Sequence, residues 1–99
     1  MKIPERFQLG GHTFTVQEGH VFVERTDLYG QCDTGRNELR LAAVTSGGAP
    51  LARSVVEQAF FHELTHAIDA IFCNRKLTED QTEQLAQGFY QVVRQMVAP

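Results

Sequence analysis

Two histidines and one glutamate stand close together in the sequence FFHELTHAID, which begins at Phe60. His62, Glu63 and His66 have the spacing H-E-x-x-H. Residues four apart lie on one face of a helix, so His62 and His66 can both offer a ring nitrogen to one metal ion. Glu63 lies about 100° around the helix from His62, where it flanks the metal without binding it. From there it can deprotonate a water whose pKa a zinc ion lowers to about 7.

The same pattern can arise by chance on an ordinary helix. A chain of this length with 4 histidines contains it by accident in about one case in a hundred. The setting argues against an accident, because three ionisable side chains among apolar neighbours are costly to bury without a purpose. The flanking apolar residues are Phe60, Phe61, Leu64, Ala67 and Ile68. We therefore interpret the motif as a metal site with Glu63 as its catalytic base.

The motif does not contain a third metal ligand. A catalytic zinc site needs three protein ligands and one open position. The metzincin pattern would place a glycine at position 69 and a histidine at position 72, where this chain has Asp69 and Phe72. We therefore expect the third ligand to come from the helix that follows, as in glutamate-zincins.

Helix geometry favours Glu83 as that ligand. At 1.5 Å per residue, His66 lies roughly 12 Å from the expected end of its helix near Asn74. An antiparallel second helix that starts at Thr78 brings Glu83 roughly 7.5 Å back along the first. Glu79 would lie less deep, and it is the main alternative. The expected zinc ligands are His62, His66 and Glu83.

Three further side chains are candidates to support the site. Asp69 follows His66 by three positions, so it either accepts a hydrogen bond from a ligand histidine or is an ordinary surface aspartate. Tyr29 and Tyr90 are candidates to stabilise an oxyanion, with packing in the core as the commoner role of tyrosine. We expect the two remaining histidines at the surface, because neither has ligand spacing.

The N-terminal part, residues 1–46, alternates between apolar and polar residues in the way that is typical of short strands. The segments HTFTVQ, HVFVERT and NELRLAAV alternate, and LYGQC and ELRLA flank a turn at residues 33–37. We predict three or four antiparallel strands, of which the last two form a hairpin. The pairs expected to share a face are Phe14 with Val16, Val21 with Val23, and Leu39 with Leu41.

Two helices follow, over residues 50–74 and 78–97. The first carries apolar residues at helical spacing, and the second begins with the capping box Thr78 to Gln81. Their short connection predicts an antiparallel pair, in which the small residues Ala86 and Gly88 let the helices approach closely. The stripe of the second helix that we expect to face the core is Leu85, Ala86, Phe89, Val92, Val93 and Met96.

Together these elements predict one α+β domain over residues 1–99, with a small sheet packed on two helices. The chain is 42% hydrophobic and its net charge is −3, which argues against a nucleic-acid binder with a basic face. No segment reaches transmembrane length and the first residues lack a signal-peptide pattern, so we expect no membrane partner and a cytoplasmic location. In that compartment Cys32 and Cys73 are expected as reduced thiols.

The motif and its context resemble the small metallopeptidases of bacteriophages and prophages, which belong to the glutamate-zincin group. HELTHAID followed by LTEDQTEQLAQGFYQVV carries the resemblance, and LGGHTFTV and LYGQCDTGRNELRL extend it over nearly the whole chain. The resemblance implies zinc at His62 and His66, a glutamate ligand that matches Glu83, and Glu63 as general base. It also implies a minimal zincin-like fold and the cytoplasm of a bacterial host.

The leading functional hypothesis is a zinc-dependent metallopeptidase that acts on a peptide or protein substrate. An extended substrate is expected to pair with the strand near residues 38–43. The alternative is a non-catalytic, zincin-like phage protein with a regulatory or structural role, motivated by the small size of the chain. A third hypothesis is a helical-hairpin interaction domain with an accidental motif. An open coordination position separates the first hypothesis from the second.

Overall fold

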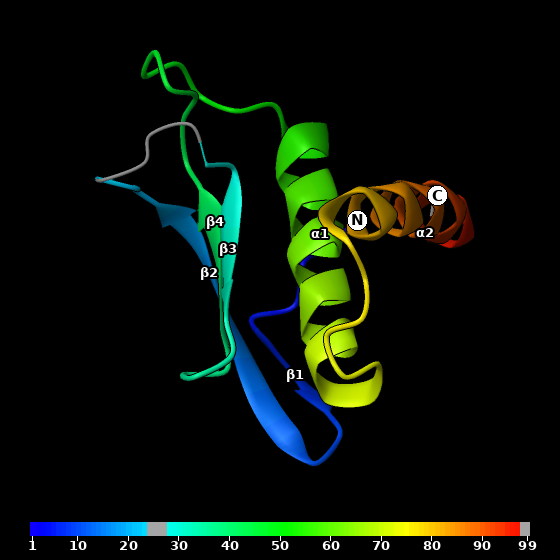
Figure 1. The fold of residues 1–99 in the computed structure, drawn as a ribbon. Helices are drawn as coiled ribbons and strands as arrows, with labels where there is room; N and C mark the ends of the chain where they lie inside the picture. Colours follow the sequence, from blue (N-terminus) through cyan, green and yellow to red (C-terminus); the bar gives the residue numbers. More distant parts are fainter. Residues whose placement is uncertain (24–27, 98–99) are drawn as a thin grey trace.

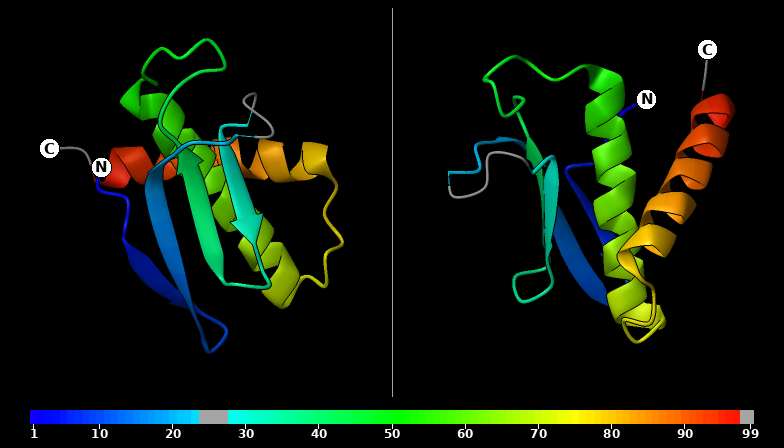
Figure 2. Two further views of the ribbon diagram at one scale, coloured as in Figure 1. Left: turned by 90° about the vertical axis from the view of Figure 1, so that its left-hand side faces the viewer. Right: turned by 45° about the horizontal axis from the view of Figure 1, so that its top comes forward.

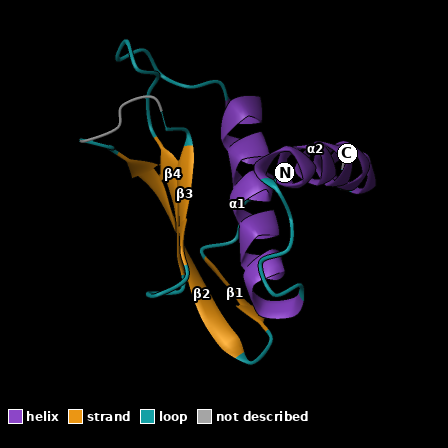
Figure 3. Ribbon diagram, in the orientation of Figure 1, coloured by secondary structure: helices purple, strands orange, loops and turns teal. Residues whose placement is uncertain are grey.

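The computed structural model describes residues 1–23 and 28–97 of the chain. Its elements, in chain order, are β1 (Arg6–Leu9), β2 (His12–His20), β3 (Gly30–Asp33), β4 (Glu38–Ala42), α1 (Arg53–Phe72) and α2 (Glu79–Met96). The four strands form one sheet that covers one side of α1, and α2 lies on the other side (Figures 1 and 3). The predicted α+β architecture is therefore confirmed, with α1 as its middle layer.

The sheet is mixed and has the strand order β1-β2-β4-β3. β1, which no sequence pattern predicted, forms an antiparallel hairpin with β2 around Gly10 and Gly11, whose φ angles of 57° and 81° suit glycine. β3 and β4 form the hairpin predicted around residues 33–37. Two of the three strand pairings are antiparallel, in line with the predicted antiparallel-rich sheet, whereas β2 and β4 run parallel. The cause is the path of the chain, because β3 occupies the outer edge and β4 must then return in the direction of β2.

The predicted strand HVFVERT is not formed in its described part. β2 ends at His20, and Val21 and Val23 are 63% and 85% exposed outside any strand. The ladder between β2 and β4 shifts register just before His20, next to Gly19 with its φ of 74°. This irregularity ends the strand, so the alternating valines face no core. Residues 24–27 of the segment lie outside the described residues.

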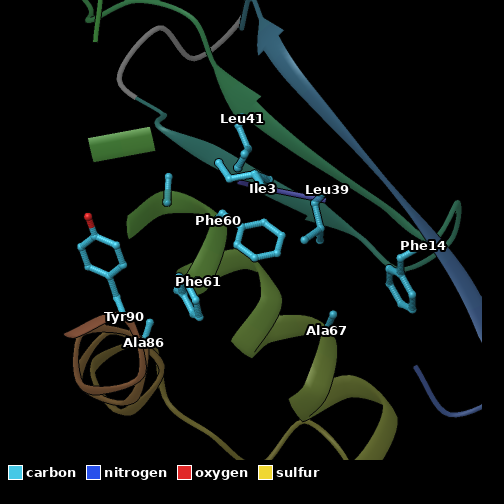
Figure 4. Packing of buried hydrophobic residues seen from close by; sticks show 10 residues of the cluster. Ile3, Phe14, Leu39, Leu41, Phe60, Phe61, Ala67, Ala86 and Tyr90 are labelled. Atoms are coloured by element: carbon cyan, nitrogen blue, oxygen red, sulfur yellow. The ribbon is translucent and has the colours of Figure 1, made fainter. Parts of the chain in front are cut away.

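The core lies between the sheet and α1 (Figure 4). Phe14, Leu39 and Leu41 point into it from the strands and are fully buried, in agreement with their alternation. From α1, the ring of Phe60 meets that of Phe7 edge-on, with centroids 6.4 Å apart. Because α1 also contacts α2, it is buried around most of its circumference rather than along one stripe. Its buried residues are Glu57, Ala59, Phe60, Phe61, Glu63, Thr65, Ala67 and Asp69.

The helix termini follow the sequence signals closely. α1 is followed by Asn74, whose φ of 54° is left-handed, as expected at the C-terminal end of a helix. The predicted capping box of α2 is confirmed: the Thr78 hydroxyl accepts a 3.1 Å hydrogen bond from the Gln81 N–H, and the Gln81 side chain accepts one of 2.9 Å from the Thr78 N–H. Neither of the described helices has the length and apolarity that crossing a membrane requires.

α2 turns back across α1 at a steep angle (Figures 1 and 2). The segment 73–78, which we call the climbing segment, runs back along α1 from its C-terminal end. As a result, α2 begins beside the middle of α1 (Figure 1). An extended chain advances up to about 3.3 Å per residue, against 1.5 Å in a helix. The segment therefore covers in a few residues the distance that α2 itself was expected to cover.

Only one face of α2 packs against α1. Thr82, Ala86 and Tyr90 are buried on that face. Because the two helices cross steeply, only part of the apolar stripe that we expected to face the core contacts α1. Most of the stripe is exposed. Its exposed members are Leu85, Phe89, Val92 and Met96. Gly88 does not ease the contact between the helices, because no described atom lies within 4 Å of the position that a Cβ would take there.

Candidate metal centre

Three side chains from two helices converge beside the middle of α1. The Nε2 atoms of His62 and His66 lie 3.2 Å apart. Glu79, in the first turn of α2, places Oε1 at 2.7 Å from Nε2 of His62 and Oε2 at 3.3 Å from Nε2 of His66. One ligand atom from each residue lies within 4.8 Å of the other two. The three groups therefore point at one shared position.

Two of the three separations suit a tetrahedral metal ion, and the third, 2.7 Å between Oε1 of Glu79 and Nε2 of His62, is that of a hydrogen bond. Zinc binds nitrogen and oxygen at about 2.0–2.1 Å, so neighbouring corners of its tetrahedron are about 3.3 Å apart. The histidine nitrogens, at 3.2 Å, match that value. Two imidazoles and one carboxylate form a donor set that zinc uses at catalytic sites, and other divalent ions accept it as well. His62, His66 and Glu79 thus fit a zinc ion.

Glu83 lies at the other nitrogen of the His62 ring. Its Oε2 is 2.5 Å from Nδ1 of His62, and Gln87 donates a 2.8 Å hydrogen bond to its Oε1. The bond from Gln87 first, and then the one to His62, hold the pKa of Glu83 below its usual value against the opposing effect of partial burial. Metal-binding histidines commonly donate their other ring N–H to a carboxylate, which fixes the tautomer. Glu83, expected as third ligand, thus stands in a supporting position, and Glu79, the alternative, stands in the ligand position.

The climbing segment 73–78 explains this difference from the sequence-based estimate. That estimate assumed that α2 begins near the C-terminal end of α1 and runs back beside it. On that assumption Glu83 would lie at the level of His66. Because residues 73–78 run back along α1, α2 begins beside the middle of α1 (Figure 1). Its first turn is therefore within contact distance of both histidines, through Glu79. Glu79 is the second residue of the capping box and the first of the helix, so its position follows directly from where α2 begins.

Asp69 anchors the climbing segment. It is buried, and its Oδ1 accepts a 3.3 Å hydrogen bond from the Leu77 N–H. Its backbone carbonyl accepts bonds from the N–H groups of Cys73 and Arg75, at 3.0 and 3.1 Å. Arg75 also donates a 2.8 Å bond to the Thr34 hydroxyl in the turn between β3 and β4. Asp69 thus helps to place α2, which differs from both alternatives that the sequence left open, a bond to a ligand histidine and an ordinary surface position.

The surroundings of His62 favour a positive charge. Burial alone would lower the pKa of this imidazole, but the carboxylates of Glu63, Glu83 and Glu79 outweigh burial and raise the pKa above its usual value. A bound metal ion would supply positive charge in place of the proton, because the ligand nitrogen must be unprotonated to bind it. Two histidines among three carboxylates thus form a centre that attracts a cation.

Glu63 lies beside the cluster and faces β3. It is only 7% exposed. Burial raises its pKa to about 7; Glu79 and Glu83 act in the same direction and His62 opposes them. Gly30 packs against it so closely that a Cβ there would lie 2.9 Å from Cγ and Oε2 of Glu63. A carboxyl group with a pKa near neutrality is well suited to accept and return a proton.

A cleft of about 1020 Å³ opens between β3 and α1 next to the cluster. The cluster residues and Glu63 form one part of its lining, and Gly30 and Cys32 of β3, with Tyr29 just before that strand, form another. A further part is apolar and includes Leu28, Pro50, Leu51, Val55 and Leu77. A cleft of this size can enclose several residues of a peptide. The metal position is therefore accessible from a cavity large enough for a substrate.

The strand beside the cleft is β3, which forms one edge of the sheet. Residues 38–43, where the sequence suggested substrate pairing, lie mainly in β4, and β4 is hydrogen-bonded to β2 on one side and to β3 on the other. That expectation is wrong, because both edges of β4 are occupied. Among the described strands β3 pairs with β4 alone, so its outer edge can accept an extended peptide.

Comparisons of the chain with protein-family models, with curated proteins and with solved structures found no match. The resemblance to the phage glutamate-zincins stays a prediction from the sequence motifs. The geometry of the site therefore carries the functional interpretation.

The two candidate tyrosines have different surroundings. Tyr29 lines the cleft and is 51% exposed. Tyr90 is buried between the helices, where its hydroxyl donates a 2.7 Å hydrogen bond to Glu57 (Figure 4 shows its place in the core). Tyr90 is thus a packing residue in this structure, whereas Tyr29 can touch a molecule in the cleft.

Several cleft residues carry no signal in the sequence. Cys32 lines the cleft, and burial above all, with the charge of Glu63, raises its pKa to about 12 against the lowering effect of Arg75. Both Cys32 and Cys73 are free thiols, as expected. Gly30 joins the cleft because β3 packs beside α1, and Arg75 joins it through the climbing segment. No local pattern specifies either of these contacts. Sequence reasoning therefore missed all three cleft residues.

Proposed function

We propose that this protein is a zinc-dependent peptidase in which His62, His66 and Glu79 bind the metal and Glu63 is the general base. The observation that carries the proposal is the convergence of three ligand atoms within 4.8 Å of one another. The accessible cleft and the buried Glu63 beside it support the same proposal. The expected zincin chemistry and the geometry thus lead to one assignment, apart from the identity of the glutamate ligand.

Each of these residues would have a separate role in peptide hydrolysis. A zinc ion bound there would act as a Lewis acid and lower the pKa of a water at its open position. Glu63 accepts a proton from the attacking water and returns it to the leaving amine, for which its pKa of about 7 is suitable. Glu83 holds the His62 ring through Nδ1 and keeps Nε2 directed at the metal. Tyr29 is the tyrosine placed to contact the substrate.

The substrate that suits this site is a peptide in extended conformation. Its backbone can add to the outer edge of β3, and its side chains can enter the cleft between β3 and α1. Glu63 lies against Gly30 of the same strand, so a peptide bound along β3 passes the general base. The expected location in the cytoplasm of a bacterial host stays a prediction from the sequence.

Zinc content and peptide cleavage, measured together, test the proposal. Purified protein loaded with zinc is incubated with a mixture of unstructured peptides, and the products are read by mass spectrometry. Glu63→Gln is expected to retain zinc and to lose cleavage by several orders of magnitude, because the base is removed and the ligands are not. The control is Glu5→Gln, an exposed glutamate outside the cleft lining. Stoichiometric zinc without cleavage, and identical behaviour of both variants, would refute the catalytic assignment.

A non-catalytic zinc protein is the second candidate, and the position of Glu83 favours it. The carboxylate of Glu83 is 2.5 Å from the His62 ring, so a modest movement would bring a fourth protein ligand to the metal. A zinc ion closed by four protein ligands is structural, whereas an open position is typical of an enzyme. The number of protein ligands on bound zinc therefore separates a peptidase from a regulatory or structural phage protein.

A further inference from the structure

The outer face of α2 carries a line of large apolar side chains. Leu85, Phe89, Val92 and Met96 are 42%, 54%, 57% and 76% exposed. Their spacing of four, three and four residues keeps them on one side of the helix. We call these four residues the α2 stripe. Four large apolar side chains in one line on a chain of 99 residues form a contiguous patch, and such patches mark interaction surfaces.

The α2 stripe is separate from the metal centre and from the core. The face of α2 that packs on α1 consists of Thr82, Ala86 and Tyr90. Glu79 and Glu83 are the α2 residues that line the cleft, and no member of the stripe does. The sheet lies on the far side of α1, as Figure 2 shows, so it does not cover the stripe. The stripe and the cleft thus involve different residues of α2.

The charges around the stripe narrow the choice of partner. From residue 84 to residue 97 the only charged residue is Arg94, and its guanidinium lies over the ring of Tyr90, 5.4 Å from the centroid, on the core side. The polar residues beside the stripe are glutamines at positions 81, 84, 91 and 95. A membrane surface would call for several Lys and Arg residues beside the apolar ones, whereas this helix has Arg94 alone, over the Tyr90 ring. An uncharged face can meet a copy of itself without repulsion between like charges.

The spacing of the stripe suits pairing with an identical helix. Steps of four and three residues are those of the a and d positions in a coiled coil, where side chains of one helix enter the gaps between those of the other. Gly88 lies beside the stripe, and no described atom comes within 4 Å of the position of a Cβ there. Glycine inside a helix is less favourable than alanine, and it lets a second backbone approach closely.

We infer that the protein forms a symmetric dimer in which the α2 stripes of two copies pack against each other. A two-fold interface presents the same patch from both chains, which is what a neutral, self-complementary stripe provides. This inference does not depend on the proposed peptidase activity, because it uses neither the metal ligands nor Glu63.

The mass of the zinc-loaded full chain in solution tests the inference. Size-exclusion chromatography with light scattering, over a range of protein concentrations, is expected to give the mass of two chains of 11.1 kDa. Gly88→Lys places a charge in the interface, and it does not disturb the monomer because its Cβ meets no described atom. Lysine also favours helix more than glycine does. We expect this variant to be monomeric with unchanged zinc content, and Phe89→Gln to weaken the dimer.

The control is Phe72→Gln, which removes an exposed aromatic side chain at the end of α1, outside the stripe. It is expected to remain dimeric. Circular dichroism of each variant establishes that the helices are retained. A monomeric wild-type chain at every concentration would overturn the inference. So would a Gly88→Lys variant that stays dimeric, or association that continues beyond two chains.

Discussion

The carboxylate of Glu79 lies 2.7 Å from Nε2 of His62, although 17 residues separate the two in sequence. The contact exists because residues 73–78 climb along α1, so that α2 begins beside the middle of α1 (Figure 1). Asp69 holds that segment through its bond to the Leu77 N–H. The metal centre is thus a property of the connection between the helices as much as of the H-E-x-x-H motif.

The two glutamates of α2 are expected to affect zinc binding unequally. Glu83→Gln weakens the support of the His62 ring and should lower zinc affinity by about 10–100-fold, the usual effect of losing such a partner. Glu79→Gln removes a ligand and should lower affinity further. Competition with a chromophoric chelator measures both. The opposite order would make Glu83 the third ligand, as the sequence predicts, and would contradict the assignment of Glu79.

Removal of the metal is expected to destabilise the fold. A ligand that binds only the native state at a hundred times its Kd adds about 2.7 kcal/mol, which for a chain of this size raises Tm on the order of 10 °C. Thermal unfolding with zinc and with EDTA measures the difference. His66→Ala, which lacks one ligand, should unfold at the same temperature under both conditions. A wild-type Tm that does not respond to EDTA would favour an accidental motif.

Much of this arrangement follows from the sequence, and the rest depends on contacts that no local pattern encodes. Periodicity found both helices, the hairpin at residues 33–37 and the inward positions of Leu39 and Leu41. The capping box fixed where α2 begins. The path of the climbing segment, and with it the steep crossing of α2, depends on hydrogen bonds of Asp69 across the loop. That path explains why Glu79, and not Glu83, lies beside Nε2 of both histidines. It also explains why the α2 stripe is exposed.

Asp69 is expected to act on the metal through the climbing segment. Asp69→Ala leaves the Leu77 N–H without its partner, which should lower the free energy of unfolding by about 1–3 kcal/mol. Zinc affinity should fall with it, because Glu79 is no longer held in place. Asp69→Asn keeps an oxygen acceptor and should restore most of the affinity. Equal zinc affinity in the wild type and Asp69→Ala would show that the segment does not position the ligand.

Gly30 is expected to be required for the placement of the general base. An alanine there would bring its Cβ to 2.9 Å from Cγ and Oε2 of Glu63, and to 3.3 Å from the Arg40 carbonyl oxygen. The displaced Glu63 should lower kcat by about 10–100-fold, as small misplacements of catalytic groups do. Zinc affinity should change little. Gly47→Ala is the control, because its Cβ meets nothing closer than 3.8 Å. Unchanged turnover in Gly30→Ala would contradict the close packing of Glu63 on β3.

The two cysteines are expected to differ in reactivity. Burial raises the pKa of Cys32 to about 12, so at pH 8 only about one molecule in ten thousand carries the reactive thiolate. Its thiolate fraction, and with it the rate of alkylation, should rise about tenfold per pH unit while the pH stays below that pKa. Cys73 is exposed and should react first. Peptide mapping after a timed reaction with iodoacetamide measures both rates. Equal rates at pH 8 would show that Cys32 is not buried in the cleft wall.

A crystal structure of the zinc-loaded protein tests the central claim most directly. The account predicts one zinc ion bound by Nε2 of His62, Nε2 of His66 and the carboxylate of Glu79. The fourth position should be open to the cleft, with Glu83 on Nδ1 of His62. A zinc ion that takes Glu83 in place of Glu79, or both glutamates together, would contradict this assignment. The absence of zinc from the two histidines would contradict the account as a whole.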